Sequence, residues 1–289
     1  MLGVDQRVFL VTGKGGVGKT TVAVGLARAS VMTGRPATLI EFGDGESGAR
    51  VLGASSGVSH RVAQSQAAVQ AAADELLGSA ILARAVTSNF AVKRVLRSAP
   101  ALRELALLEF VRRIAEENPR HTIVVDMPAS GHGLAWLRVP ERLAALLVTG
   151  PLHNMAQRVQ REIVSSRQTA VVLVTLPEKL VLEETVELAQ GLKRELGLSP
   201  ARIVINRVPA RVPEEVDLVL KGRDGSRDSA ESAELYRFLD VRREQRRQVE
   251  AALEGSIGGA LDPVLLPLWP TDPPRDVVAD WIERGGGAP

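Results

Sequence analysis

A glycine-rich loop close to the amino terminus constrains the fold of this chain more than any other feature. Residues 13–20, Gly-Lys-Gly-Gly-Val-Gly-Lys-Thr, fit the pattern G-x-x-x-x-G-K-[ST] at every fixed position. The apolar run at 7–12 predicts a buried strand before the loop, and the Ala/Val/Leu-rich run at 21–29 predicts a helix after it. A strand, a glycine-rich loop and a helix in this order form a phosphate site, because the backbone N–H groups of the loop and the positive end of the helix point at one anion. The loop therefore predicts a bound nucleotide rather than a chance glycine-rich turn.

Each part of the loop has an expected role in such a site. We expect Lys19 to reach the β- and γ-phosphates as a catalytic residue, and the Thr20 hydroxyl to ligate Mg²⁺. The glycines let successive N–H groups approach the phosphates without interference from Cβ atoms. The expected cofactors are ATP or ADP and Mg²⁺. The nucleotide-binding residues predicted in this loop are Gly13, Lys14, Gly15, Gly16, Val17, Gly18, Lys19, Thr20 and Thr21.

A second lysine, Lys14, distinguishes this loop from an ordinary P-loop, which does not require lysine at that position. The pattern K-G-G-x-G-K-[ST] resembles the deviant Walker A loop of the class that includes MinD, ParA, ArsA and the nitrogenase iron protein. In that class the early lysine reaches across a dimer interface to the nucleotide of the partner. The resemblance implies a dimer in which Lys14 is a catalytic residue in trans, supplying positive charge where charge builds up in the transition state. The alternative interpretation is a solvated loop lysine.

Strand-like runs alternate with helical runs along the rest of the chain. Near-continuous β-branched runs separated by helices favour a parallel sheet covered on both faces. The predicted fold is a three-layer α/β P-loop NTPase with a mostly parallel central sheet, and with binding residues at the carboxyl ends of the strands. We expect one ATPase domain over residues 1–284 and a disordered tail at 285–289. Beyond the first strand, the predicted strands are 37–42, 121–126, 170–175, 202–206 and 264–267.

One long segment, residues 57–118, shows no convincing strand pattern and is interpreted as an α-helical insertion. Within it, apolar residues recur at helical spacing, at Leu105, Leu108, Val111 and Ile114. We interpret this apolar face as packing on the core, in preference to a groove that would bind a protein client.

Asp126 ends an apolar strand after the P-loop, in the position of a Walker B carboxylate. A carboxylate in that position holds Mg²⁺, usually through water. The following loop contains Gly131 and His132. A glycine-bearing loop directly after the metal carboxylate is where a γ-phosphate sensor belongs, so we expect the Gly131 N–H to contact the γ-phosphate. We interpret His132 as a conformational or interface residue, because no partner for a catalytic base is visible.

Residues 126–132, Asp-Met-Pro-Ala-Ser-Gly-His, resemble the D-x-A-P-T-G-H switch II of the arsenite-pump ATPase (ArsA) family, which includes the eukaryotic ATPase that guides tail-anchored membrane proteins. Residues 174–185 are similar to the V-T-x-P-E-x-L…E-T segment of that family. The strand ending at Asn206 resembles a family strand whose asparagine recognises adenine, and 265–267 resemble a late L-P loop beside the purine. The resemblance therefore implies that Asn206 and Pro267 contact the base, and an amide suits an adenine edge because it both donates and accepts. The alternative for Asn206 is a turn residue at a strand end.

The chain also departs from the ArsA pattern. The family has S-T-D-P-A-H after its second strand, with the aspartate positioning the attacking water, whereas residues 41–47 read Glu-Phe-Gly-Asp-Gly-Glu-Ser. Asp44 is the nearest catalytic candidate to orient water, with Glu46 behind it, so we expect hydrolysis to be slow or partner-dependent. The chain has no cysteine, which excludes a thiolate arsenite site and a CxxC zinc clamp. With four methionines in the whole chain, the insertion also lacks the Met-rich surface that would favour tail-anchor targeting.

Charge and hydropathy narrow the possible partners. Lys and Arg number 36 against 34 Asp and Glu, which gives a net charge of +2, so nothing favours nucleic acid. No apolar run reaches the roughly 18 residues of a membrane span, and the amino terminus lacks a signal-peptide pattern, so we expect a cytoplasmic protein. We expect the polar residues 221–232 to form a mobile loop. The basic stretch 242–247 is interpreted as a solvated helix face rather than a phosphate site.

These features predict a Mg²⁺-ATP-dependent dimeric switch, an ATPase of the ArsA-like family whose partner is a second copy or a paralogue. Two alternatives stay open. A MinD/ParA-type positioning ATPase would use the same loop, although the charge is balanced and residues 275–283 are short for an amphipathic membrane helix. A non-catalytic nucleotide-binding subunit, paired with an ATPase paralogue, would account for the altered segment after the second strand.

Overall fold

The core of the fold is a seven-stranded parallel sheet, seen in a computed structural model that describes residues 6–53, 57–77, 100–128, 133–211, 230–255, 263–269, 278–280 and 282. The strands lie in the order β3-β2-β4-β1-β5-β6-β7, and every neighbouring pair is parallel. Their bounds are β1 Val8–Thr12, β2 Ala37–Phe42, β3 Val58–Ala63, β4 Thr122–Asp126, β5 Thr169–Thr175, β6 Arg202–Val208 and β7 Val264–Pro267. The predicted three-layer α/β P-loop class is confirmed.

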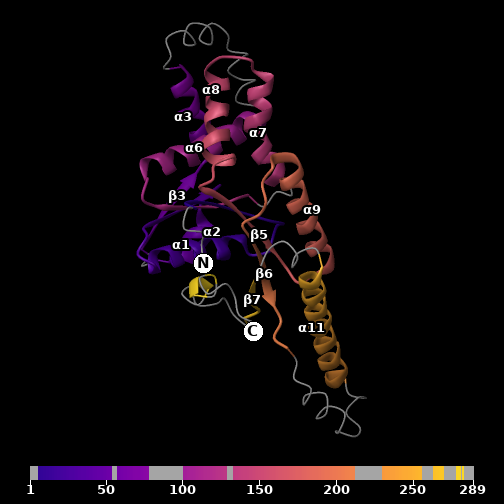
Figure 1. Cartoon of the computed structure of the whole chain (residues 1–289). Coiled ribbons are helices and arrows are strands. Elements are labelled where there is room, and N and C mark those ends of the chain that lie inside the picture. Colours follow the sequence, from indigo (N-terminus) through magenta and orange to yellow (C-terminus); the bar gives the residue numbers. More distant parts are fainter. Residues whose placement is uncertain are drawn as a thin grey trace.

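Helices cover both faces of this sheet (Figure 1). One apolar core lies between the sheet and α1, and it includes Val278 and Ile282 from the end of the chain. The larger core lies on the other face, where residues of α3, α6, α7, α8, α9 and α11 pack. The helices are α1 Lys19–Met32, α2 Glu46–Leu52, α3 Ser65–Leu77, α6 Pro100–Glu117, α7 Gly133–Leu146, α8 Pro151–Val159 with the π-helical turn η1 Gln160–Val164, α9 Lys179–Leu196 and α11 Ala230–Glu254.

Two central strands explain where the P-loop lies. β1 pairs with β4 on one side and β5 on the other, and all five of its residues are buried. Residues 13–18 leave the carboxyl end of β1 and turn directly into α1. The loop therefore lies at the edge where all the parallel strands end, as the strand-loop-helix pattern predicts.

The expectation that residues 57–118 contain no strand is wrong at the start of that segment. β3 lies there and pairs with β2 over its whole length, from Val58 beside Ala37 to Ala63 beside Phe42. Its inner residues, Ser-His-Arg, are polar because β3 is an edge strand, and only Ala63 is fully buried. Without a continuous β-branched run or a clear apolar alternation, the strand gives little local signal, and its pairing with β2 decides its conformation.

The helical part of the segment matches its prediction more closely. Leu105, Leu108, Val111 and Ile114 all lie on α6 and are all buried in the larger core. The interpretation of this face as core packing is therefore confirmed for α6. Residues 78–99 of the same segment lie outside the described residues.

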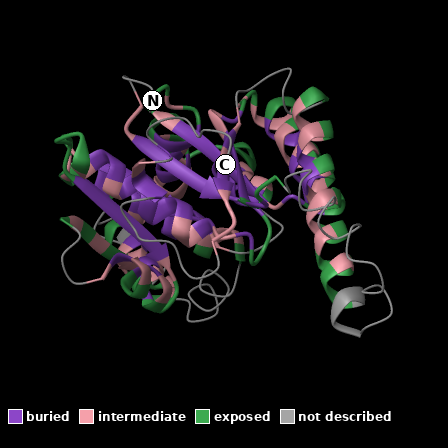
Figure 2. Ribbon diagram, turned by 90° about the horizontal axis from the view of Figure 1, so that it is seen from below, coloured by how far each residue is buried: buried purple, intermediate pink, exposed green. Residues whose placement is uncertain are grey.

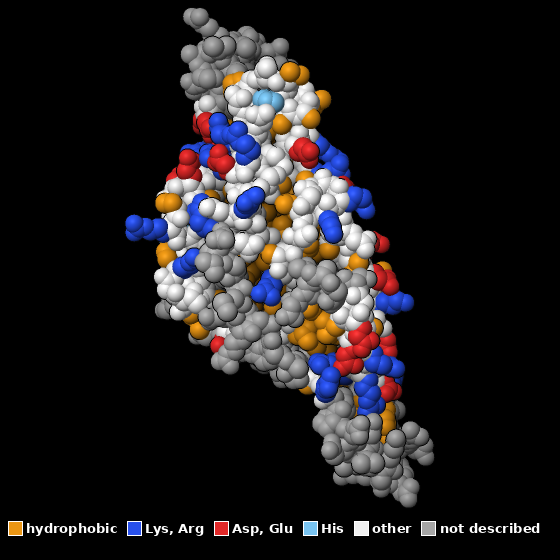
Figure 3. Space-filling model, in the orientation of Figure 1, with side chains coloured by type: hydrophobic (Ala, Val, Ile, Leu, Met, Phe, Trp, Pro, Cys, Tyr) orange, Lys and Arg blue, Asp and Glu red, His pale blue; other side chains and the backbone are white. Residues whose placement is uncertain are grey.

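α11 extends away from the sheet and is largely half-buried or exposed (Figure 2). Side chains of both charges alternate over it (Figure 3). Arg243 pairs with Asp240 and Arg247 with Glu244, which fits the solvated helix face expected for 242–247. Arg246 differs, because it is buried and bonds Glu250 and the Pro209 carbonyl. Most of the loop expected at 221–232, and the tail at 285–289, lie outside the described residues.

Candidate nucleotide-binding site

The P-loop is held against β5 and β6 at positions where only glycine fits. Gly13 has φ +148°, and a Cβ there would overlap the Val174 carbonyl of β5. Gly18 caps α1 with φ +91°, and a Cβ there would overlap the Asn206 side-chain nitrogen of β6. The loop therefore adopts left-handed conformations under close contact, which L-residues with a side chain strongly disfavour.

Lys19, Thr20 and Asp126 meet inside the loop. The Thr20 hydroxyl donates to Asp126 Oδ2 at 2.6 Å, and Lys19 Nζ donates to the Lys14 carbonyl at 2.9 Å. Lys19 and Asp126 are only 6% and 7% exposed. Burial lowers the pKa of the Lys19 ammonium, and the Asp126 charge partly offsets that. Thr20 and Asp126, the two predicted Mg²⁺ ligands, thus share a direct hydrogen bond across 106 residues, and their binding of the ion stays a prediction.

The second oxygen of Asp126 indicates what this carboxylate is built to bind. Asp126 Oδ1 is buried and has no hydrogen-bond partner in the described residues. A buried carboxylate oxygen without a partner is costly, so it marks a place for an absent donor or cation. Mg²⁺ prefers oxygen ligands, and P-loop sites supply it with one hydroxyl, one carboxylate and phosphate oxygens. The residues present therefore fit a magnesium ion, even though no group of three or more His, Asp or Glu side chains gathers in the described residues.

Burial raises the pKa of Asp126 to about 6. The Thr20 hydrogen bond and the Lys19 charge act in the opposite direction, and the nearby Glu41 charge adds to the increase. A bound divalent cation would remove this cost, because it stabilises the ionised carboxylate directly.

Glu41 is a second buried carboxylate that the sequence analysis did not assign to the site. It lies beside Asp126 in the β2–β4 register and is 6% exposed. Its Oε2 accepts a hydrogen bond from the Gly48 N–H at 2.8 Å and lies 3.2 Å from His60 Nε2. The Glu41 side chain thereby connects β2 to α2 and to β3. The sequence does contain a signal for Glu41, because it is the only charged residue in the run 37–42, and a carboxylate is rarely buried in a strand without a partner.

Asp44, the residue expected to orient water, is exposed. Its Oδ1 accepts a hydrogen bond from the Glu46 N–H at 3.1 Å, which closes a local turn before α2. Glu46 is also exposed. Neither carboxylate is held by a buried contact in the way that Glu41 is, so their roles in catalysis stay predictions.

Lys14 lies on the outside of the loop. Its Nζ is 2.9 Å from Glu184 Oε1 on α9, and the two side chains are 46% and 43% exposed. The solvated loop lysine that was the alternative interpretation therefore has a definite partner within its own chain. Its expected role in trans stays a prediction.

Asn206 and Pro267 lie at the carboxyl ends of β6 and β7. The Asn206 amide donates to the Val17 carbonyl at 2.9 Å and accepts from the Arg207 N–H at 2.9 Å. Arg207 has φ +58°, so Asn206 stands just before a left-handed residue, where the pairing of β6 with β7 is irregular. The amide thus braces the P-loop, and its contact with adenine stays a prediction, as does that of Pro267. Gly131 and His132 lie outside the described residues.

Residues 8–221 match the family model of the CobQ/CobB/MinD/ParA nucleotide binding domain. The chain belongs to this family. Among curated proteins, it is 30% identical to ATPase BagA of Mycobacterium tuberculosis over 246 residues, which covers 77% of this chain and 71% of BagA. A Mycobacterium bovis protein provisionally named an ATPase matches with the same identity and coverage.

Membership of the CobQ/CobB/MinD/ParA family agrees with the site geometry. The matched region includes the P-loop, Asp126 and Asn206, and the relatives carry the name of an ATPase. A nucleotide-binding protein of the ATPase class is therefore supported. None of the helices in the described ranges combines the length and apolar character needed to cross a bilayer.

Proposed function

We propose that this protein is a Mg²⁺-dependent ATPase that acts as a dimeric switch, in an ArsA-like branch of the CobQ/CobB/MinD/ParA family. Lys19 and the backbone of residues 13–21 would bind the phosphates, and Thr20 and Asp126 would hold the ion. Bound Mg²⁺ supplies positive charge that neutralises the phosphate oxygens. The family match and the partnerless oxygen of Asp126 support this assignment.

One observation carries the dimeric part of the proposal: the two lysines of a single loop lie in opposite environments. Lys19 is buried and directed into the loop, whereas Lys14 extends outward to Glu184. An outward cation that is fixed only by an exposed ion pair can exchange that partner for a stronger anion at little cost. The phosphates of a nucleotide held by a second copy would be such an anion, so dimerisation would move Lys14 from Glu184 to the partner's site.

The ArsA-like branch is supported by where Glu184 lies. Glu184 belongs to residues 174–185, the segment that resembles the family's V-T-x-P-E-x-L…E-T pattern. Two threonines of this segment, Thr175 and Thr185, both donate to the Val181 carbonyl, at 3.2 and 2.8 Å. These bonds fix the start of α9 relative to β5, and so place the carboxylate that Lys14 meets.

A second candidate function is a nucleotide-binding subunit that does not hydrolyse ATP alone and pairs with an ATPase paralogue. The observation that favours it is the exposed position of Asp44, whose carboxylate serves a local turn. Hydrolysis needs a group that positions water, and a paralogue would supply it at a shared interface. A MinD/ParA-type role would instead appear as ATP-dependent binding to duplex DNA or to membrane vesicles.

The test is ATP turnover of the purified protein, with the oligomeric mass measured in parallel under ADP and under ATP. Wild type is compared with Lys14→Ala, and Lys193→Ala serves as the control because it removes an exposed lysine of α9. We expect wild type and Lys193→Ala to form an ATP-dependent dimer with turnover, and Lys14→Ala to lose both.

Each outcome separates the candidates. ATP binding without turnover, restored by adding a paralogue, would identify the non-catalytic subunit. A Lys14→Ala protein that dimerises and hydrolyses normally would remove the trans-lysine switch. Absence of nucleotide binding in wild type would overturn both candidates.

A further inference from the structure

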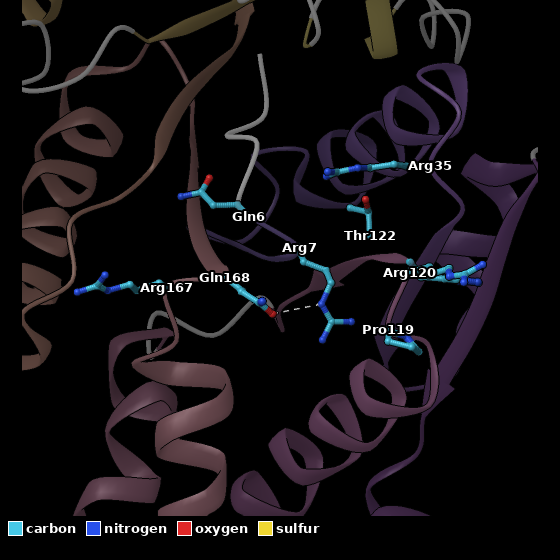
Figure 4. A pocket seen from close by; sticks show the side chains of 9 residues that line it. Gln6, Arg7, Arg35, Pro119, Arg120, Thr122, Arg167 and Gln168 are labelled. Atoms are coloured by element: carbon cyan, nitrogen blue, oxygen red, sulfur yellow. Dashed lines mark hydrogen bonds between the residues drawn. The ribbon is translucent and has the colours of Figure 1, made fainter.

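A second cavity lies at the edge of the sheet opposite the P-loop, where the strands begin (Figure 4). Its volume is about 560 Å³. The segments that precede β1, β2, β4 and β5 converge on it, and these four strands are neighbours in the sheet. The cavity is therefore built by the same strands as the nucleotide site, at their other ends.

The lining of this cavity is strongly positive. Four of the nine lining residues are arginines, a histidine is also present, and no Asp or Glu is among them. Of the acidic residues near the adjoining ends of α6 and η1, Glu116 and Glu162 both bond Arg112, and Glu117 is exposed but does not line the cavity. The basic residues of the cavity are Arg7, Arg35, Arg120, Arg167 and His121.

One arginine of the group has a structural task. Arg7 Nη1 donates to the carbonyls of Ala115 and Asn118, at 2.8 and 3.1 Å, at the carboxyl end of α6. Its Nε also lies 3.4 Å from Gln168 Oε1. Arg7 thus neutralises the negative end of a helix, which is a common use of a cation at this edge of an α/β fold.

Arg120 and Arg167 have no comparable task. Both are exposed, and neither side chain makes a hydrogen bond or an ion pair with the described part of the chain. In the view of Figure 4 they lie on opposite sides of the cavity and their guanidinium groups point away from one another, whereas the Arg35 side chain is directed toward the middle. No carboxylate of the described residues lines the cavity, so the positive charges of Arg120 and Arg167 are not neutralised there.

We propose that this cavity binds a small anion carrying two or more phosphate groups. Each guanidinium offers a planar fork that matches two phosphate oxygens, and the exposed side chains of Arg120 and Arg167 can turn toward an anion held in the cavity. The volume is that of a small-molecule site. No Phe, Tyr or Trp is among the described residues that line the cavity, so we expect recognition to rest on phosphate and not on stacking of a base.

The proposed site is separate from the nucleotide site. β1 connects the two, and its five residues span about 17 Å at the usual rise of a strand. The phosphates of a nucleotide bound at the P-loop therefore do not reach Arg120 or Arg167, and the two sites can be tested independently.

The test is calorimetric titration with inorganic tripolyphosphate and, separately, with fructose 1,6-bisphosphate. The protein is saturated with Mg²⁺-ADP to block the P-loop, and a Lys19→Ala variant repeats the measurement with that site removed. Arg120→Ala/Arg167→Ala is compared with Arg113→Ala/Arg142→Ala, which removes the same charge from exposed positions on α6 and α7 outside the cavity.

We expect at least one probe to bind, and the cavity double variant to weaken that binding by about tenfold or more while the control double variant does not. Binding of tripolyphosphate alone points to a polyphosphate chain as the ligand, and binding of the sugar bisphosphate to a phosphorylated metabolite. Binding of neither probe, or equal weakening in both double variants, would overturn the proposal. If ADP did not bind at the P-loop, the Lys19→Ala variant would still report phosphate binding in the cavity. The proposed function and the proposed cavity site can therefore fail independently.

Discussion

Lys14 and Glu184 form an ion pair across 170 residues, with Nζ and Oε1 2.9 Å apart. The pair joins the P-loop to α9 and occupies the lysine for which we propose a role in trans. Because both side chains are nearly half exposed, solvent weakens the pair, and it adds little to stability. The pair does have a consequence for binding, because any other anion that binds Lys14 must compete with the Glu184 carboxylate.

The first prediction concerns Glu184→Ala. We expect the free energy of unfolding to change by less than about 0.5 kcal/mol, because exposed ion pairs contribute little. We expect the ATP-dependent dimer to form at lower protein concentration, because Lys14 no longer has a competing partner. Thermal melts and mass measurements across a concentration series check both, with Glu183→Ala as the neighbouring exposed control. Weaker dimerisation in Glu184→Ala would show that Glu184 assists the interface instead of competing with it.

The second prediction concerns the metal. Removal of Mg²⁺ by EDTA should weaken ATP binding to wild type by about tenfold or more, because Asp126 and Thr20 would hold the ion and its positive charge would stabilise the phosphates. In Asp126→Asn the difference between Mg²⁺ and EDTA should largely disappear. Fluorescent-nucleotide titrations with and without EDTA measure it, and an unchanged Mg²⁺ dependence in the variant would remove Asp126 from the metal site.

The third prediction concerns pH and the ligand-free protein. The pKa of Asp126 is raised from 3.8 to about 6, so the folded state holds its proton more tightly than the unfolded state does. This group therefore favours folding below pH 4, and that contribution is lost as the pH rises through 6, by on the order of 3 kcal/mol. Between pH 4 and 7 in EDTA, wild type should therefore lose stability relative to Asp126→Asn, whose amide does not titrate. Denaturant melts measure it, and a constant difference would contradict the raised pKa.

The fourth prediction concerns Gly18. Gly18→Ala should destabilise the fold by about 1–3 kcal/mol and abolish nucleotide binding, because the new Cβ combines an unfavourable φ with overlap on Asn206. Gly34→Ala is the matched control: its φ is +82°, but no atom lies within 4 Å of the added Cβ. Gly34→Ala should cost only about 1 kcal/mol and leave binding intact. Equal effects of the two substitutions would show that Asn206 does not hold the loop.

Much of the fold could be read from the chain because its buried parallel strands are short, continuous and apolar. β1, β4 and β5 are flanked by strands on both sides, so every residue must suit the interior and the pattern becomes local. β3 failed as a prediction for the opposite reason: at the edge of the sheet, polar residues are tolerated and pairing with β2 decides the conformation.

The residues of the candidate site likewise fall into those that a local pattern predicts and those that only long-range contacts bring together. The P-loop, Thr20 and Asp126 follow from a motif whose geometry is set by phosphate and metal chemistry. The Lys14–Glu184 pair and the contact of Asn206 with Val17 join residues 170 and 189 positions apart, so no local pattern encodes them. Glu41 was visible as an acid in an apolar run, but only its register beside Asp126 relates it to the site.

Whether Lys14 acts across a dimer interface is tested most directly by mixing two inactive variants. Lys14→Ala keeps an intact metal site and lacks the lysine, whereas Asp126→Asn keeps the lysine and lacks the metal carboxylate. If Lys14 acts in trans, the mixed dimer keeps one lysine and contains one complete site, so the mixture should regain ATP turnover, up to the limit of about a quarter of the wild-type value that random pairing sets. Turnover in the mixture no higher than the average of the two variants alone would contradict a lysine shared between protomers.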